Sequence, residues 1–142
     1  MRECGVWSAE CGMIIAIGRK GTNMKYENLK GRTKQFALAI VKLVERLPHD
    51  QTSRVLGNQL LRSGTSVAAN YRAACRGKSA ADFISKMNNV EEEADESCFW
   101  LELIVDSGKL KSSEVSDLHR EAGELTAIVV ASIKTARGNQ SR

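Results

Sequence analysis

From residue 29 onward the chain holds four segments in which apolar residues recur three or four positions apart. That spacing places apolar side chains along one face of an α-helix. The pattern predicts helices over about 31–47, 50–77, 79–108 and 113–138. Four helices joined by short loops pack as an antiparallel up-down-up-down bundle, so the expected fold class is all-α.

The ends of these segments carry helix start and stop signals. Pro48 ends the first helix because proline lacks an amide donor and clashes with the preceding turn. Asp50, Ser79 and Ser113 are expected to cap the next three helices, since their side-chain oxygens accept hydrogen bonds from unpaired backbone amides. Gly108 marks the end of the third helix.

Residues 1–28 lie outside the helical pattern. Their short apolar stretch precedes Arg19 and Lys20, which is the wrong order for a signal peptide, and no apolar run is long enough to span a membrane. Two hypotheses remain, a disordered leader or a misassigned start with Met24 as the true first residue. The expected organisation is a leader over 1–28 and one bundle domain over 29–142.

The cysteines and histidines form no metal-binding pattern. None of the four cysteines forms a closely spaced pair, and neither histidine lies near them in the sequence. We therefore expect no structural metal and no disulfide framework, and a reducing cytoplasm is the default location. Cys75 and Cys98 fall at helical apolar positions and are expected in the core.

The net charge of +4 is distributed unevenly. Residues 51–81 carry five basic side chains and no acidic one, whereas residues 82–106 carry one basic and eight acidic side chains. On a helical wheel the arginines of the second helix share one quadrant, opposite the apolar stripe. Because guanidinium and ammonium groups bind phosphate oxygens, basic residues on the first two helices are candidate nucleic-acid contacts. They are Arg54, Arg62, Arg72, Arg76, Lys78, Lys30, Arg32 and Lys34.

An alternative assigns part of this charge to the fold. Arg62 or Arg72 would form salt bridges with Glu93 or Glu96 on the acidic third helix. The two interpretations are compatible, because Arg54 and Arg76 lie at opposite ends of the second helix.

The third helix has apolar residues on two sides. Leu101 and Val105 are expected to face the core. Phe99, Trp100 and Leu103 point away from that face. A bundle helix that is apolar on two sides usually has a partner on the second, so these three residues are a candidate interface between copies of the chain. The alternative is that Trp100 packs beneath a neighbouring helix of the same bundle.

Catalytic motifs are missing from the sequence. Neither histidine has an acidic residue three positions before it, and the chain has no phosphate-binding loop and no nucleophile elbow. We therefore expect a protein that is not an enzyme and has no metal, no cofactor and no catalytic residue.

Several motifs resemble those of a known family. The run from Leu60 to Arg72, then Phe83, the acidic run 91–96 and the pair Trp100-Leu101 are similar to the four helix bundle protein family, also called ribosomal RNA intervening-sequence proteins. The resemblance covers about residues 29–137. It implies an antiparallel four-helix bundle that assembles as a ring-like homopentamer.

The resemblance also implies a function. It indicates kinship with the accessory variability determinant of diversity-generating retroelements, a relative that binds nucleic acid and a reverse transcriptase through a basic surface. Arg62, Asn70 and Arg72 match the family's motif in the second helix, and Glu93 and Glu96 match its acidic positions. In place of an acid that many relatives carry, this chain has an alanine at position 73.

Two function classes remain at this stage. The leading hypothesis is a non-enzymatic homo-oligomer that binds RNA or another nucleic acid through its basic surface. The alternative is a protein-interaction scaffold, for example an accessory factor for a reverse transcriptase, in which the arginines serve only in salt bridges.

Overall fold

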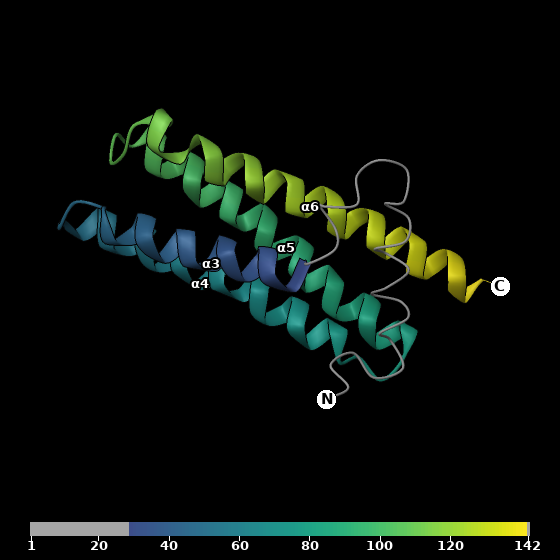
Figure 1. Ribbon diagram of the computed structural model, residues 1–142. Coiled ribbons are helices and arrows are strands. Elements are labelled where there is room, and N and C mark those ends of the chain that lie inside the picture. The colour runs from purple at the N-terminus through teal and green to yellow at the C-terminus, as the bar shows by residue number, and fades with distance from the viewer. Residues whose placement is uncertain (1–28, 142) are drawn as a thin grey trace.

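The computed structural model describes residues 29–141, so the expected leader over 1–28 lies outside the described part of the chain. Successive helices run antiparallel and form two hairpins that pack side by side (Figure 1). The all-α four-helix bundle is thereby confirmed, and no strand occurs within the described residues. The helices are α3 (Leu29–Glu45), α4 (Gln51–Cys75), α5 (Ala80–Asp106) and α6 (Ser112–Gln140).

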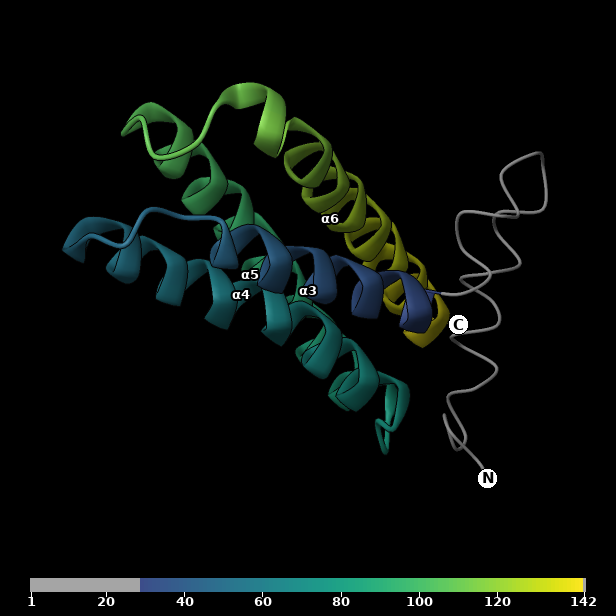
Figure 2. The same cartoon turned by 60° about the vertical axis from the view of Figure 1, so that its left-hand side comes forward.

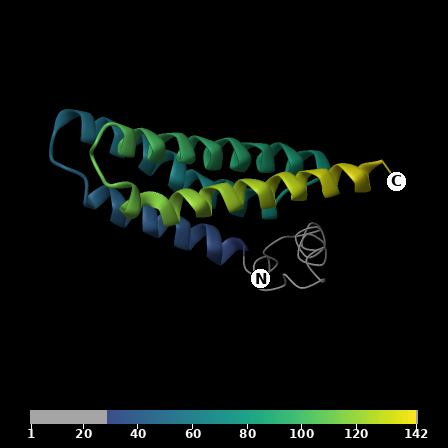
Figure 3. The same ribbon diagram turned by 90° about the horizontal axis from the view of Figure 1, so that it is seen from above.

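The four helices do not pack evenly around the bundle. The contacts of α4 with α5, α5 with α6 and α3 with α4 are extensive, whereas α3 and α6 touch over a much shorter stretch. Figure 2 shows α6 crossing α3 at an angle. With 17 residues, α3 is also the shortest of the four described helices, and α6 continues past its beginning (Figure 3).

The apolar stripes of all four helices meet in one continuous core. Fully buried side chains come from every helix, and burying each one contributes roughly 1.5–3 kcal/mol relative to leaving it in water. Cys75 is buried as expected, whereas Cys98 is only partly buried. The largest core side chains include Ile40, Leu60, Phe83, Met87, Leu101 and Leu125.

Two of the three expected helix caps are present. The backbone amide of Ser53 donates to the Asp50 carboxylate over 2.8 Å at the start of α4. The backbone amide of Asp82 donates to the Ser79 hydroxyl over 3.1 Å at the start of α5. These bonds satisfy amides that have no partner within the helix.

The expected cap of α6 is wrong. Ser113 lies inside the first turn, because the helix begins at Ser112. The capping position is Lys111, whose backbone amide donates to the Glu114 carboxylate over 2.9 Å. This bond pairs the backbone amide of the capping residue itself, whereas the expected serine hydroxyl would have accepted from an amide inside the first turn.

The first helix ends two residues earlier than expected. The amides of Arg46 and Leu47 bond to carbonyls three residues back, which is a tighter turn than an α-helix. The residue before a proline disfavours helical backbone, so the turn ahead of Pro48 takes this form. Leu47 still packs into the core with 6% of its surface exposed.

Two glycines let α3 lie close against α4. A Cβ atom on Gly64 would come within 2.8 Å of the Ile40 side chain, and one on Gly57 within 2.9 Å of Leu47. Real Cβ atoms do not approach other atoms so closely, so larger residues at these positions would push the two helices apart.

Candidate functional site

A groove between α3 and α4 is lined by three cationic side chains. Lys30 and Lys34 come from α3, one helical turn apart, and Arg72 comes from α4. The groove has a volume of about 530 Å³. We call it the basic groove, and the rest of its lining is small: Gly31, Thr65, Ala68 and Ala69.

The sequence explains why the basic groove forms here. Thr65, Ala68, Ala69 and Arg72 recur three or four positions apart, so they share one side of α4, and the short side chains leave space beside the arginine. None of the described residues that line the groove carries a carboxylate. Within the described residues, the lining therefore presents an anion with cationic donors and no carboxylate.

Most of the predicted phosphate contacts surround this groove. Lys34, Arg72, Arg76 and Lys78 are exposed, and none forms an ion pair with the residues that the structure describes. Arg76 lies one turn beyond Arg72. Arg54 is also exposed, but it lies about 27 Å from Arg72 along α4 at 1.5 Å per residue, so it belongs to the other end of the helix.

Arg62 is turned toward α5 and away from the groove. Its guanidinium lies 3.3 Å from the Glu93 carboxylate and forms a second, closer bond to Glu96. The Glu96 carboxylate raises the pKa of Arg62, and the Arg62 guanidinium lowers the pKa of Glu96. Of the two roles expected for Arg62, the structure shows the salt bridge, whereas Arg72 takes no part in it.

Arg32 is also drawn into the fold. Its Nε and Nη2 atoms lie 2.5 and 2.8 Å from the two Glu121 oxygens, and Nη2 lies 2.5 Å from Glu124. Only 18% of its side chain is exposed, and the carboxylate of Glu121 raises its pKa further. We expected a nucleic-acid contact here, but the acids on α6 already occupy the guanidinium. Their spacing of three residues on one helix face was the available signal.

The expected interface residues divide into two kinds. Phe99 is 52% exposed, whereas Trp100 and Leu103 are half-buried and pack against the core. The Trp100 indole donates to Glu96 over 2.9 Å and meets the Phe99 ring edge to face at 4.9 Å. Trp100 thus packs against the core of its own bundle, and the two contacts named are with residues of α5, its own helix. The interface between copies stays a prediction, now centred on Phe99.

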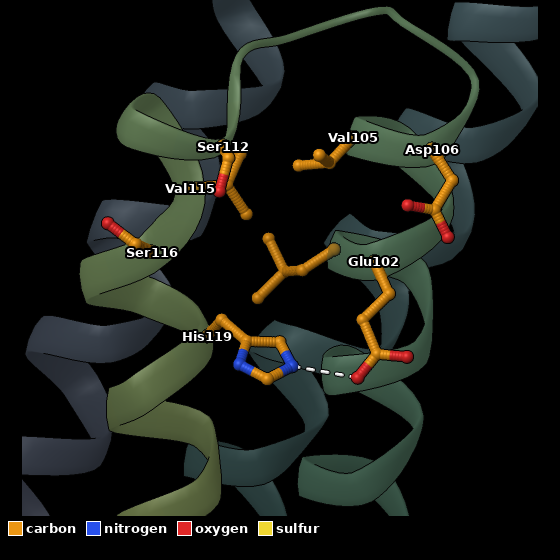
Figure 4. A pocket seen from close by; sticks show the side chains of 8 residues that line it. Glu102, Val105, Asp106, Ser112, Val115, Ser116 and His119 are labelled. Carbon is orange, nitrogen blue, oxygen red and sulfur yellow. Dashed lines mark hydrogen bonds and ion pairs between the residues drawn. The ribbon is translucent and has the colours of Figure 1, made fainter.

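A second pocket lies between α5 and α6, and sequence reasoning missed it (Figure 4). It has a volume of about 380 Å³ and an apolar floor of Leu101, Val105 and Val115. Val105 was expected in the core, but Ile104 takes that position. We call this pocket between α5 and α6 the acidic pocket. Its walls are formed by polar side chains: Glu102, Asp106, Ser112, Ser116 and His119.

Two polar side chains of the acidic pocket contact each other across it. Nε2 of His119 lies 2.8 Å from Oε1 of Glu102 (Figure 4). No group of three metal-ligating side chains occurs in the described part of the chain. Within residues 29–141, no helix combines the length and apolar content that crossing a membrane requires.

The fold and the basic groove define a class of protein, a small all-α bundle with its charge divided between two hairpins. The chain belongs to the 23S rRNA-intervening sequence protein family, whose model matches residues 28–131. It is also similar to a crystal structure from Bacteroides thetaiotaomicron, described as a protein of unknown function from the S23 ribosomal protein family. The two share 35% identity and a TM-score of 0.70 over 74% of this chain and 97% of the other. No curated protein matches this chain.

Proposed function

We propose that this protein is a non-enzymatic helical bundle that binds RNA through its phosphate backbone at the basic groove. One observation carries the proposal: Lys30, Lys34 and Arg72 converge on a groove whose lining has no carboxylate. Ammonium and guanidinium groups form charge-assisted hydrogen bonds with phosphate oxygens, and a guanidinium can form two in parallel. Arg76 and Lys78 extend the positive surface beyond the groove.

The same lining argues against base recognition. Apart from its cations, the groove presents Gly31, Thr65, Ala68 and Ala69, which have no amide or aromatic group to read base edges or stack on them. The Thr65 hydroxyl donates to the Leu61 carbonyl over 2.7 Å, so its proton is engaged in the helix. Binding is therefore electrostatic and independent of sequence.

Family membership supports RNA as the nucleic acid to test first. The family is named after the intervening sequence of 23S rRNA, and the similar crystal structure is assigned to a ribosomal protein family. A structured ribosomal RNA hairpin is the natural probe.

The experiment is a salt titration of RNA binding, followed by fluorescence anisotropy with the full chain. About four phosphate contacts would make the affinity fall by roughly a hundredfold between 50 and 200 mM salt. Binding that does not change with salt contradicts the proposal, because counterion release is its main driving force.

A charge-reversed pair of variants locates the site. Lys34→Glu with Arg72→Glu is expected to abolish binding, and both positions are exposed, so the fold tolerates the change. The matched control is Lys134→Glu with Arg137→Glu, which removes the same charge from exposed positions on α6. If both double variants lose binding equally, net charge alone is responsible and the groove is not the site.

The proposed form is a homo-oligomer, and the resemblance to the family implies a pentamer. Phe99 supports this, because an aromatic side chain with 52% of its surface in water gains from burial against a second copy. Light scattering of the wild-type chain and of Phe99→Ser tests it. A wild-type monomer at micromolar concentration contradicts it.

The Arg62 salt bridges favour a second candidate, a protein-interaction scaffold that serves, for example, a reverse transcriptase. In this case the wild-type chain has no salt-sensitive RNA affinity to lose. The titration above therefore separates the two functions before any variant is made.

A further inference from the structure

The acidic pocket has an apolar floor and a negatively charged wall. Leu101 and Val115 are almost fully buried, at 0 and 2% exposure, so the floor is the edge of the core itself. Figure 4 shows Val105 and Val115 facing each other across the pocket, with Glu102 and Asp106 on the α5 side. Its volume of about 380 Å³ lies within the range of sites that hold small organic groups.

Among the described residues, no lysine or arginine forms an ion pair with the carboxylates of this wall, Glu102 and Asp106. Asp106 forms no ion pair with the described residues, and the ion-pair partner of Glu102 among them is His119. Two cations close to this wall in the sequence pair with other acids: Lys109 lies 3.2 Å from Asp50, and Arg120 lies 2.9 Å from Asp117.

The charge of the whole hairpin extends this local imbalance. Residues 79–141 carry twelve acidic and six basic side chains, so α5 and α6 attract cations and repel the phosphates of RNA. The occupant of the pocket must therefore be positively charged, and it must have an apolar portion to cover the floor. With no group of three metal-ligating side chains among the described residues, a metal ion does not meet this description.

We propose that the acidic pocket binds an arginine side chain from a basic segment of a partner protein. The aliphatic part of the arginine lies on Val105 and Val115, and its guanidinium reaches Asp106 and Glu102. Arginine fits better than lysine, because its planar fork donates two parallel hydrogen bonds to a carboxylate while its stem stays apolar. The bundle then has two binding surfaces of opposite sign on different hairpins.

The test is a methyl NMR titration of the full chain with a short probe, acetyl-leucyl-arginine amide. We expect saturable shifts of the Val105 and Val115 methyl groups, with a Kd of about 1 mM. The control probe has citrulline in place of arginine, which keeps the shape and removes the charge. It is expected to bind at least about tenfold more weakly.

A pair of variants with equal charge change locates the binding. Asp106→Asn, in the wall of the pocket, is expected to weaken binding about tenfold. Asp117→Asn is the matched control, since Asp117 is 88% exposed on α6, lies outside the pocket lining and carries the same charge. Both positions are at the surface, so neither change threatens the core.

Three results would overturn the proposal. The first is no shift of either valine at a probe concentration of about 10 mM, ten times the expected Kd. The second is that the wild type binds the citrulline probe as tightly as the arginine probe, or that the Asp106→Asn variant binds the arginine probe as tightly as the wild type does. The third is dissociation of a homo-oligomer by Asp106→Asn in light scattering, which would show that a second copy of the chain occupies the pocket.

Discussion

The two hairpins of this bundle share a fold and differ in charge. Residues 29–78, which hold α3 and α4, carry ten basic and two acidic side chains, whereas residues 79–141 carry six basic and twelve acidic ones. Both hairpins bury the same kind of apolar stripe in one core. The opposite surface charges of the two hairpins are therefore not required for their helices to form. This difference in charge is the best guide to what each face of the molecule binds.

The hairpins also meet through a repeated arrangement of charge. Arg62 of α4 lies between Glu93 and Glu96 of α5, and Arg32 of α3 bonds to Glu121 and Glu124 of α6. In both cases two acids three residues apart hold one guanidinium from the basic hairpin. These ion pairs neutralise part of the positive charge of one hairpin and part of the negative charge of the other. The remaining charged side chains of each hairpin face solvent.

The largest expected effect concerns packing, where the hairpins also differ. Gly64→Val would drive a side chain into Ile40, because even a Cβ atom there lies 2.8 Å from it. We expect a loss of about 3 kcal/mol in the free energy of unfolding, the upper end of the range for overpacked cores. Urea unfolding followed by circular dichroism measures it.

The control is the same substitution in the other hairpin. A Cβ atom on Gly123 of α6 would have nothing within 4 Å, so Gly123→Val should change the free energy of unfolding by less than about 0.5 kcal/mol. Equal losses at the two positions would show that the close approach of α3 to α4 is not the cause, because valine has a higher helix propensity than glycine and does not itself weaken a helix.

The next effect tests the arginines between the hairpins. Arg32→Met keeps the apolar stem and removes the bonds to Glu121 and Glu124, so we expect a loss of about 1–2 kcal/mol in the free energy of unfolding. Arg62→Met should cost less, because 48% of the Arg62 side chain is exposed against 18% for Arg32, and water screens its salt bridges.

Binding provides an independent check on the same variants. RNA affinity at constant salt should change by less than about twofold in Arg32→Met, since its guanidinium is held by carboxylates and is not offered to phosphate. A loss as large as that of the groove variants would place Arg32 back among the phosphate contacts and break the division between structural and binding arginines.

Local patterns predicted the fold well, and the reason is physical. Helical periodicity and the caps at Asp50 and Ser79 depend on residues within one or two turns, so they can be recognised along the chain. The site depends on how far α4 is rotated toward α5. Arg62 and Arg72 share a quadrant of the wheel, yet only Arg62 meets Glu93 and Glu96, a distinction that periodicity cannot make.

The acidic pocket shows the same limit at another place. The pocket exists because the rotation of α5 places Ile104 in the core and leaves Val105 partly exposed, beside α6. Both residues are apolar neighbours in sequence, and a small rotation of the helix decides between them. Its wall also needs His119 opposite Glu102, two residues on different helices.

The smallest expected effect is the dependence of stability on pH, and it concerns the carboxyls at the helix starts of the acidic hairpin. The pKa of Glu114 is lowered, first by the backbone amide of Lys111 and then by Arg46, and the pKa of Asp82 is lowered by Lys86 and the amide of Lys78. A carboxyl whose folded pKa is lowered stabilises the fold above its unfolded pKa. That contribution is lost as the pH falls through the folded pKa.

Stability should therefore hold from neutral pH down to about 4.5 and decline below it. Thermal unfolding between pH 7 and 3 measures the decline in the wild type and in Glu114→Gln. The variant should unfold at a lower temperature than the wild type at pH 7. Its unfolding temperature should fall less steeply with decreasing pH, because the neutral side chain has no charge to lose. A decline as steep as that of the wild type would show that other carboxyls, such as Asp82 at the start of α5 or Asp50 at the start of α4, set the acid sensitivity, and that the start of α6 does not.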